Sequence, residues 1–154
     1  YLGKDNENGA RLAVEEINRQ GLTINGKAIT LELLGEDDAG DPKLGTQVAQ
    51  KLVDSKVVAV VGHLNSGVTI PASKIYSEAG IVQISPSSTN PEYTKQGYKT
   101  AYRMVGTDAQ QGPVLAKFAL ETLKGKSIAI VDDATQYGKG LADEFEKKII
   151  SSGS

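Results

Sequence analysis

The feature that most constrains this fold is a run of five apolar residues, Val57 to Val61, of which four are valine. Branched side chains at Cβ lose freedom in a helix and pack well on a pleated surface. A short apolar run without polar alternation is typical of a strand that is covered on both faces, as in a parallel sheet. The run therefore predicts a parallel α/β fold.

Helical and strand patterns alternate on both sides of this run. Asp41 followed by Pro42 is a strong helix start, because Asp caps free N–H groups and Pro fits the first helical position. The Asn25–Gly26 pair predicts a tight turn before the alternating residues 29–34. We predict helices over residues 5–20, 42–54, 71–79, 109–123 and 140–150, and strands over 29–34, 57–61, 81–85, 100–105 and 127–131.

This order of elements predicts a three-layer open parallel sheet with helices on both faces, as in flavodoxin-like domains. In such sheets ligands bind outside the carboxyl ends of the strands. Two of the predicted strands are followed there by residues with hydroxyl groups: Ser66 after the first, and Ser87, Ser88 and Thr89 after the second. Hydroxyl and backbone N–H groups that converge in this way can hold a carboxylate through charge-assisted hydrogen bonds. Taken singly, each of these residues is more simply explained by local loop and cap hydrogen bonds.

Composition excludes several other classes of function. With 17 basic and 19 acidic residues and a net charge of -2, the chain has no basic stripe for nucleic acid. No apolar run approaches the roughly 20 residues that span a bilayer, so we expect a chain that is not embedded in the membrane, with any export signal already removed. The absence of cysteine excludes disulfides and thiolate metal sites. No glycine-rich phosphate motif occurs, so we predict neither a nucleotide cofactor nor a metal.

Several motifs in the same order resemble the branched-chain amino-acid-binding proteins. They are Gly3-Lys4-Asp5-Asn6-Glu7-Asn8-Gly9-Ala10, Glu36-Asp37-Asp38 before Asp41-Pro42, Gly62-His63-Leu64-Asn65-Ser66, Ile84-Ser85-Pro86, Gln111-Gly112-Pro113 and Gln136-Tyr137-Gly138-Lys139-Gly140-Leu141. These type I periplasmic binding proteins are extracytoplasmic receptors that deliver leucine, isoleucine and valine to the membrane subunits of ABC importers. The resemblance implies a non-enzymatic protein whose two α/β lobes close on an amino acid, most simply an aliphatic one.

The resemblance also implies roles for single residues. Ser66 and Thr89 match the donors to the ligand carboxylate, and the carbonyl of Ser87 matches the acceptor of the ligand ammonium, with Ser88 beside it. Tyr137 resembles a tyrosine of the pocket wall. Leu2, next to Tyr1, falls where some relatives carry a ligand-contacting tyrosine, which changes the side-chain pocket. A disulfide that some relatives form at the positions of Gly40 and Asn65 is impossible here.

Family members are about twice as long, so the resemblance implies that this chain corresponds to one lobe and the beginning of a second. Residues 1–124 match a first lobe that lacks its first strand, residues 125–150 match the opening strand and helix of a second lobe, and residues 151–154 read as a tail or linker. The missing strand is central in a flavodoxin-like order. We therefore expect residues 127–131 to fill the gap between the strands at Ile29 and Val57, in the same chain or in a strand-swapped or fragment dimer.

Two other interpretations remain open from the sequence. One is a flavodoxin-like scaffold without a ligand. The other is an enzyme or phospho-receiver domain that uses Asp37 and Asp38 for a metal, although Gly62-His63 stands where such a domain needs a phospho-acceptor Asp. His63, the only histidine, has no acid near it in the sequence and is predicted to be a structural residue at a strand end.

Overall fold

A parallel sheet of three short strands forms the centre of the molecule in a computed structural model, which describes residues 2–153. The strands are β3 (Ala59–Val61), β4 (Val82–Ser85) and β5 (Ala101–Arg103), and they are ordered β3-β4-β5. Val60 pairs with Gln83, which pairs with Ala101. The predicted α/β class with a parallel sheet is confirmed, and the strands over residues 57–61, 81–85 and 100–105 are present in shorter form.

Two helices cover one face of this sheet. Helix α2 (Pro42–Asp54) has the predicted bounds, and the side chain of Asp41 accepts a hydrogen bond from the N–H of Leu44. Helix α3 (Ser66–Glu78) packs against it, and both contact Val60. The buried core consists of Val48, Ala49, Leu52, Val60, Ala72, Tyr76 and Ile81. The central body is therefore held by burial of apolar side chains between α2, α3 and β3.

The other face of β3 is open, so the prediction of a strand buried on both faces is wrong. Val61 is 56% exposed and Val58 is 86% exposed, whereas Val60 is only 8% exposed. The reason is that the core formed with α2 and α3 covers only the face of β3 to which Val60 belongs, and Ala59 and Val61 lie on the opposite face.

Helix α3 begins five residues earlier than predicted. Pro71 was expected at the first helical position, but it lies inside the helix, and Asn65 stands before the first turn. Ser66 and Gly67 are consequently the first two residues of the helix. Their N–H groups belong to the first turn, where no carbonyl of the same helix is available to accept from them.

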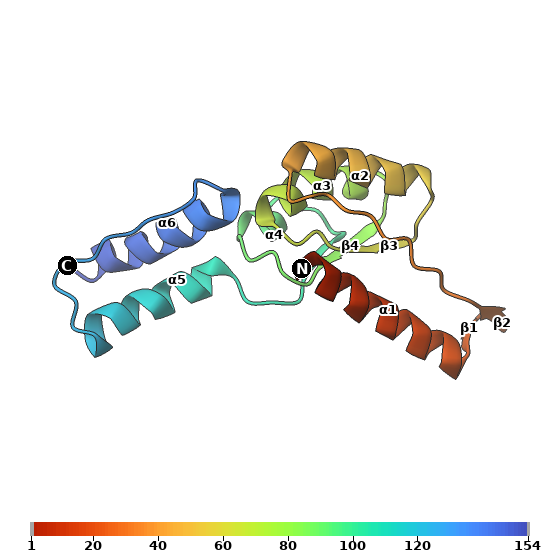
Figure 1. The fold of residues 1–154 in the computed structure, drawn as a ribbon, viewed down its shortest axis with the longest axis horizontal. Helices are drawn as coiled ribbons and strands as arrows, with labels where there is room; N and C mark the ends of the chain where they lie inside the picture. Colours follow the sequence, from red (N-terminus) through yellow and green to blue (C-terminus); the bar gives the residue numbers. More distant parts are fainter. Residues whose placement is uncertain (1, 154) are drawn as a thin grey trace.

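A long helix, α1 (Leu2–Gln20), extends away from the centre together with a small hairpin (Figure 1). The helix has no buried residue. The hairpin joins β1 (Leu22–Ile24) to antiparallel β2 (Lys27–Ile29). Its turn at Asn25 and Gly26 has φ angles of 51° and 74°, the left-handed backbone that the predicted Asn-Gly turn requires.

The predicted strand over residues 29–34 is wrong beyond Ile29. Residues 31–34 are not part of a sheet, because no described strand lies beside them. The backbone of Leu31 bonds instead to the side chain of Asn18 in α1, through its N–H at 2.8 Å and its carbonyl at 2.9 Å. An amide side chain thus replaces a neighbouring strand at that one residue.

The opposite end of the molecule is an arm of two paired helices, α5 (Asp108–Lys117) and α6 (Gln136–Ser151) (Figure 1). Helix α5 continues into a π-helical turn, η1 (Phe118–Thr122), and a short helix, α4 (Glu92–Lys95), lies between β4 and β5 in the chain. The two arm helices pack so closely that a Cβ at Gly112 would lie 2.8 Å from the backbone of Glu144. Helix α6 starts at Gln136, four residues before the predicted Gly140, and Thr135 caps it. The helix includes Ser151 of the predicted tail over residues 151–154. Ser154 lies outside the described residues.

Residues 127–131 do not fill a gap in the sheet, so that expectation is wrong for this chain on its own. They form no strand and run back along the arm toward the start of α6. Ile128 and Ile130 are 37% and 42% exposed. The arm carries these residues away from the central body, where the open edge of β3 lies (Figure 1).

The packing of α2 on α3 predicts opposite effects for two glycine-to-alanine changes. A Cβ at Gly45 would lie 2.2 Å from Cγ1 of buried Val68, whereas nothing lies within 4 Å of a Cβ at Gly9 in α1. We expect Gly45→Ala to lower the free energy of unfolding by about 1–3 kcal/mol through overpacking. Gly9→Ala should raise it by up to about 1 kcal/mol through helix propensity. Urea unfolding followed by circular dichroism measures both, and equal effects of the two changes would contradict the described helix contact.

Candidate functional site

The carboxyl ends of β3 and β4 are joined by hydrogen bonds to the carbonyl of His63. Ser85 Oγ donates to this carbonyl at 2.8 Å, and Thr69 Oγ1 donates to it at 3.1 Å. The N–H of Gly62 donates to the carbonyl of Ile84 at 2.9 Å. The loops after the two strands therefore start side by side, which is the juxtaposition that the sequence predicted.

Ser66 and Ser88, one from each loop, are brought into direct contact. Their hydroxyl oxygens lie 3.2 Å apart, and the N–H of Asn90 donates to Ser66 Oγ at 3.3 Å. Both side chains are 1% exposed. Because only one hydroxyl proton is used between the two oxygens, the pair keeps a second proton that an anion could accept.

Half-buried Thr89, the residue after Ser88, lies beside fully buried Asp108. The N–H of Asp108 donates to the carbonyl of Thr89 at 3.0 Å. Burial raises the pKa of the Asp108 carboxyl, although the Thr89 hydroxyl and Arg103 act in the opposite direction. Neither Thr89 Oγ1 nor the Asp108 oxygens have a partner that meets hydrogen-bond geometry among the described residues. Polar groups of this kind are seldom left unpaired in native proteins, so this corner of the site is suited to a polar ligand or water.

Arg103 holds the loop that carries Ser87, Ser88 and Thr89. Its Nη1 donates to the carbonyls of Ser88 at 3.2 Å and Asn90 at 2.8 Å, and its Nη2 donates to Thr94 Oγ1 at 2.7 Å. Its guanidinium lies 5.8 Å from the ring centre of Tyr93. Burial raises the pKa of Tyr93 to about 12. One cation thus binds two carbonyls of the loop after β4 and a side chain of α4.

Ser87 faces helix α1 instead of the Ser66–Ser88 pair. Asn6 Nδ2 donates to Ser87 Oγ at 3.1 Å. The N–H of Ser88 bonds to Ser85 Oγ at 2.9 Å. Ser87 therefore links the loop after β4 to the first turns of α1, near Leu2, which is 70% exposed.

His63 is a buried structural residue, as predicted, but an acid does lie beside it. Its Nδ1 is 2.6 Å from Asp38 Oδ2, and its Nε2 is 3.1 Å from the hydroxyl of Tyr76. The hydrogen bond from His63 lowers the pKa of Asp38, and burial raises the pKa of Tyr76. The Asp38–His63–hydroxyl order resembles a catalytic array, but its hydroxyl belongs to a phenol that is fully buried and hard to ionise. The three side chains instead tie the loop before α2 to α3.

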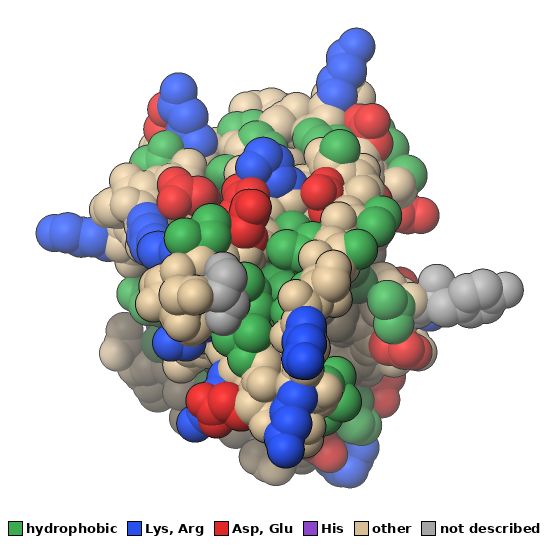
Figure 2. All heavy atoms as spheres, turned by 90° about the vertical axis from the view of Figure 1, so that its left-hand side faces the viewer, with side chains coloured by type: hydrophobic (Ala, Val, Ile, Leu, Met, Phe, Trp, Pro, Cys, Tyr) green, Lys and Arg blue, Asp and Glu red, His purple; other side chains and the backbone are tan. Residues whose placement is uncertain are grey.

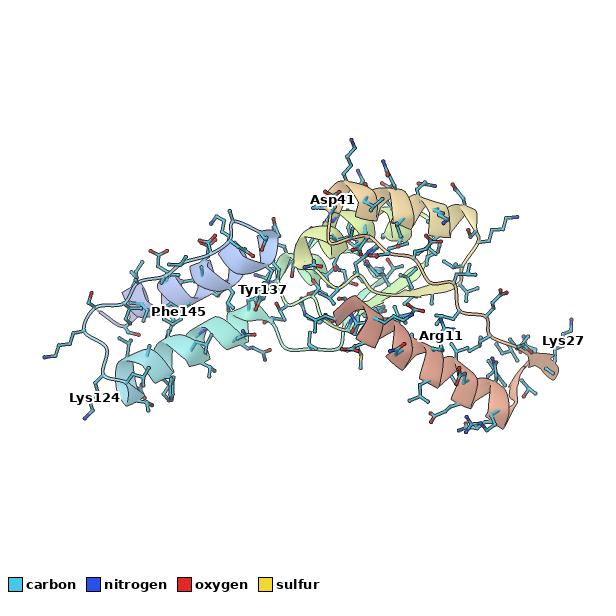
Figure 3. All side chains as sticks on the ribbon, in the orientation of Figure 1. Arg11, Lys27, Asp41, Lys124, Tyr137 and Phe145 are labelled. Atoms are coloured by element: carbon cyan, nitrogen blue, oxygen red, sulfur yellow. The ribbon has the colours of Figure 1, made fainter. Side chains whose placement is uncertain are left out.

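The start of α6 lies over the start of α3. Asn90 Nδ2 donates to the carbonyl of Gln136 at 2.8 Å, and the Cβ of Gln136 would lie 3.4 Å from a Cβ at Gly67. Tyr137, at the beginning of α6, is 42% exposed (Figure 3). The first residue of helix α6 thereby lies against Gly67 and Asn90, the neighbours of the Ser66–Ser88 contact.

A polar hollow of about 380 Å³ lies on the other side of Asn90, between α4 and α6. This volume falls within the range of small-molecule sites. Neither Ser66 nor Ser88 lines it; its walls are Asn90, Pro91, Glu92, Lys95, Ala134, Thr135, Gln136, Lys139, Gly140, Asp143 and Glu144. The two serines, each 1% exposed, are therefore not reached through this hollow.

The acidic residues before α2 are engaged in their own loop. Asp37 Oδ1 accepts from the N–H of Ala39, and Asp38 Oδ1 accepts from the N–H of Gly40, both at 2.8 Å. Among residues 2–153, no three His, Cys, Asp or Glu side chains gather as a metal site would need. The acids thus act as loop-forming acceptors here.

A comparison with protein families matches the description "periplasmic binding protein" over residues 1–153. The chain belongs to this family. Two relatives are a Leu/Ile/Val-binding protein homologue of Brucella melitensis, 46% identical over 152 residues, and a leucine-specific-binding protein of Salmonella typhimurium, 48% identical over 135 residues. These alignments cover 99% and 88% of this chain, but only 40% and 36% of the relatives. The chain thus spans about two fifths of the length of the relatives it matches.

Comparison with solved structures also matches the chain to periplasmic binding proteins, here through its fold. The branched-chain amino-acid transporter substrate-binding protein LivJ of Streptococcus pneumoniae, solved with isoleucine, superposes with a TM-score of 0.84 at 35% identity. That match covers 95% of this chain and 41% of LivJ. An ABC transporter substrate-binding protein of Desulfitobacterium hafniense, solved with leucine, gives 0.75 at 38% identity, over 96% of this chain and 43% of that one. The α/β lobe is therefore that of the type I periplasmic binding proteins. In this chain, moreover, no helix of residues 2–153 has the length and apolarity of a membrane span.

Sequence reasoning missed Asn6, Arg103 and Asp108. Arg103 sits in a strand that was identified only by its apolar neighbours, so its side chain gave no signal. Asp108 follows Thr107 at the start of α5, where an acid normally indicates a helix N-terminus. Only the three-dimensional contacts reveal that both residues act on the loop after β4.

The Asp38–His63 pair predicts a loss of stability in acid. Because the folded pKa of Asp38 lies below its ordinary value of 3.8, the pair stabilises the fold above that pH, and this contribution is lost as the pH falls through the folded pKa. We expect Asp38→Asn to reduce the free energy of unfolding by about 1–2 kcal/mol at pH 6, and the difference from wild type to shrink toward about pH 2. Urea titrations at several pH values measure this difference.

The matched control is Asp37→Asn, whose exposed side chain bonds only to the N–H of Ala39. It should change stability little, and without a comparable dependence on pH. A difference between wild type and Asp38→Asn that stays constant from neutral to acid pH would contradict an ionised Asp38 in the fold.

Proposed function

We propose that this chain is the amino-acid-binding part of an extracytoplasmic solute-binding protein. Its ligand would be an amino acid, most simply an aliphatic one, for delivery to the membrane subunits of an ABC importer. The observation that carries the proposal is the contact between Ser66 and Ser88 at the ends of two parallel strands, at the start of α3. The family match and the leucine and isoleucine in the two related structures support it.

In the proposed mode, the ligand carboxylate lies at the first turn of α3. The first-turn N–H groups of Ser66 and Gly67, the remaining hydroxyl proton of the serine pair, and Thr89 would donate to it. A helix N-terminus favours an anion through its free N–H groups and its dipole. The carbonyl of Ser87 would accept from the ligand ammonium.

Tyr137 and Leu2 complete the proposed mode on its outer side. Tyr137 sits in the first turn of α6, whose first residue lies beside Gly67 and Asn90, and Leu2 sits in the first turn of α1. Closure over the ligand would then be a movement of the start of α6 relative to α3, of the kind that hinged binding proteins use. The bond between Asn90 and Gln136 would open and re-form in this movement. No step of the proposed function forms or breaks a covalent bond.

The proposal predicts weak binding of leucine by the 154-residue chain. Two or three charge-assisted hydrogen bonds contribute roughly 3–9 kcal/mol, and the cost of immobilising the ligand offsets part of this, so we expect a Kd on the order of 1 mM. We expect Ser66→Ala to weaken binding about tenfold or more, because one donor at the carboxylate is lost. Calorimetric titration with millimolar L-leucine and L-valine measures this.

The control variant is Ser55→Ala at the end of α2, where the hydroxyl bonds only to the carbonyl of Lys51. It should bind leucine like wild type. L-Leucinamide, which lacks the carboxylate, should not bind. Lack of binding by a well-folded wild type, or equal binding of leucine and leucinamide, would contradict the proposal, and the former would favour a scaffold without a ligand.

A further inference from the structure

The side chain of Arg103 is turned inward, onto the loop after β4. Lysine and arginine side chains project into solvent on the face at the end of the arm (Figure 2). The lysine and arginine side chains that form ion pairs are 48–65% exposed. Arg103 is half-buried instead, and its bonds go to two carbonyls and a hydroxyl group. Because burial of a cation costs free energy, these hydrogen bonds must compensate for that cost.

The bond from Arg103 to the carbonyl of Ser88 sets the direction of the next N–H group. Nη1 of Arg103 donates to this carbonyl at 3.2 Å. The peptide between Ser88 and Thr89 is trans, so its carbonyl and its N–H point in opposite directions. The N–H of Thr89 is therefore directed away from Arg103 and from β5, the strand that Arg103 ends.

The side opposite Arg103 is the side of the serine pair. Strand β4 lies between β3 and β5, and Ser66 lies in the loop region after β3, at the start of α3. The next peptide of the loop has the same orientation. Its N–H, from Asn90, donates to Ser66 Oγ at 3.3 Å, and its carbonyl, from Thr89, accepts from the N–H of Asp108 at 3.0 Å. Two successive carbonyls thus face β5 and α5, and the N–H groups of the same peptides face the start of α3.

The N–H of Thr89 is a donor that the fold leaves unused. Among residues 2–153 it has no acceptor, whereas the N–H of Ser88 donates to Ser85 Oγ and that of Asn90 donates to Ser66 Oγ. A carbonyl that accepts from a cation polarises its peptide, which makes the N–H of that peptide a stronger donor. Successive N–H groups that point to one side of a loop are suited to an anion.

We propose that Arg103 is a positioning residue of the carboxylate site: through the carbonyl of Ser88 it directs the N–H of Thr89 at the ligand carboxylate. The inference rests on the proposed function, because it needs a carboxylate beside the serine pair. Arg103 acts through one peptide and does not touch the ligand. Its planar fork is required, because Nη1 holds two carbonyls while Nη2 holds Thr94, and a lysine has one nitrogen for all three.

Chemical shifts of Arg103→Met test this role with and without ligand. The variant keeps a long apolar side chain but has no donor, so without ligand the carbonyl carbon of Ser88 should shift upfield. In a titration with L-leucine its Kd should rise at least about fivefold, because one donor is no longer held in place. The leucine-induced shift of the Thr89 amide should fall, while those of Ser66 and Gly67 persist at saturation.

Arg103→Lys keeps the charge and should change the Kd and the Thr89 response in the same direction, but less. It supplies every readout if Arg103→Met loses its fold, which circular dichroism detects. The matched control is Thr94→Val, which removes only the bond to Nη2 and leaves both carbonyl contacts. This control should keep the wild-type Kd and the wild-type carbonyl shift of Ser88.

Three results would overturn the inference: a wild-type Kd in the folded Arg103 variants, an unchanged carbonyl shift of Ser88, or an equal loss of the Ser66 and Thr89 responses. Failure of the proposed function gives a different pattern. Well-folded wild type would then show no leucine-induced shift, while the Ser88 carbonyl still responds to Arg103→Met. That pattern would support the contact between Arg103 and the peptide and would overturn its role toward a ligand.

Discussion

The arrangement of the site depends on the carbonyl of His63. This single acceptor receives hydroxyl groups from Ser85 on β4 and Thr69 on α3, and it therefore fixes the end of one strand against the end of the next. The same residue bonds through its ring to Asp38 and Tyr76. Because the His63 ring and the hydroxyl groups are shielded from water, the cost of leaving any of them unpaired keeps the others in place. The contact of Ser66 with Ser88 is a consequence of this junction.

The same molecule is uneven in its packing. Burial of apolar side chains is concentrated in α2, α3 and β3, while α1 has no buried residue and the arm extends to the other side. Elements with few buried contacts open at lower free energy than a packed core. The start of α6, which lies against Gly67 and Asn90, belongs to the less buried part. Under the proposed function, this difference in packing would suit binding and release of a small solute.

The sequence predicted the parts whose signals are local. Asp41 and Pro42 gave the start of α2, Asn25 and Gly26 gave the hairpin turn, and the valine run gave β3. The sequence-based prediction was wrong for residues 31–34 and 127–131. Both segments have strand-like patterns, but a strand forms only where a neighbouring strand is available to hydrogen-bond with it. It also placed the start of α3 at Pro71, because Pro is common at the first helical position, whereas Asn65 is the residue before the first turn. The serine and threonine residues of the site could be named from their positions after two strands. Arg103 and Asp108 could not, because their roles come from contacts across the loop.

Amide chemical shifts during a titration with L-leucine show whether an amino-acid carboxylate binds where the ends of β3 and β4 meet. We expect the largest shifts at Ser66, Gly67, Ser88 and Thr89, with smaller shifts at Gln136 and Tyr137 as α6 moves. L-Leucinamide should leave the amides of Ser66 and Gly67 unchanged. Shifts confined to the hollow around Lys139, or spread over the arm without change at Ser66 and Thr89, would show that the carboxylate does not bind there.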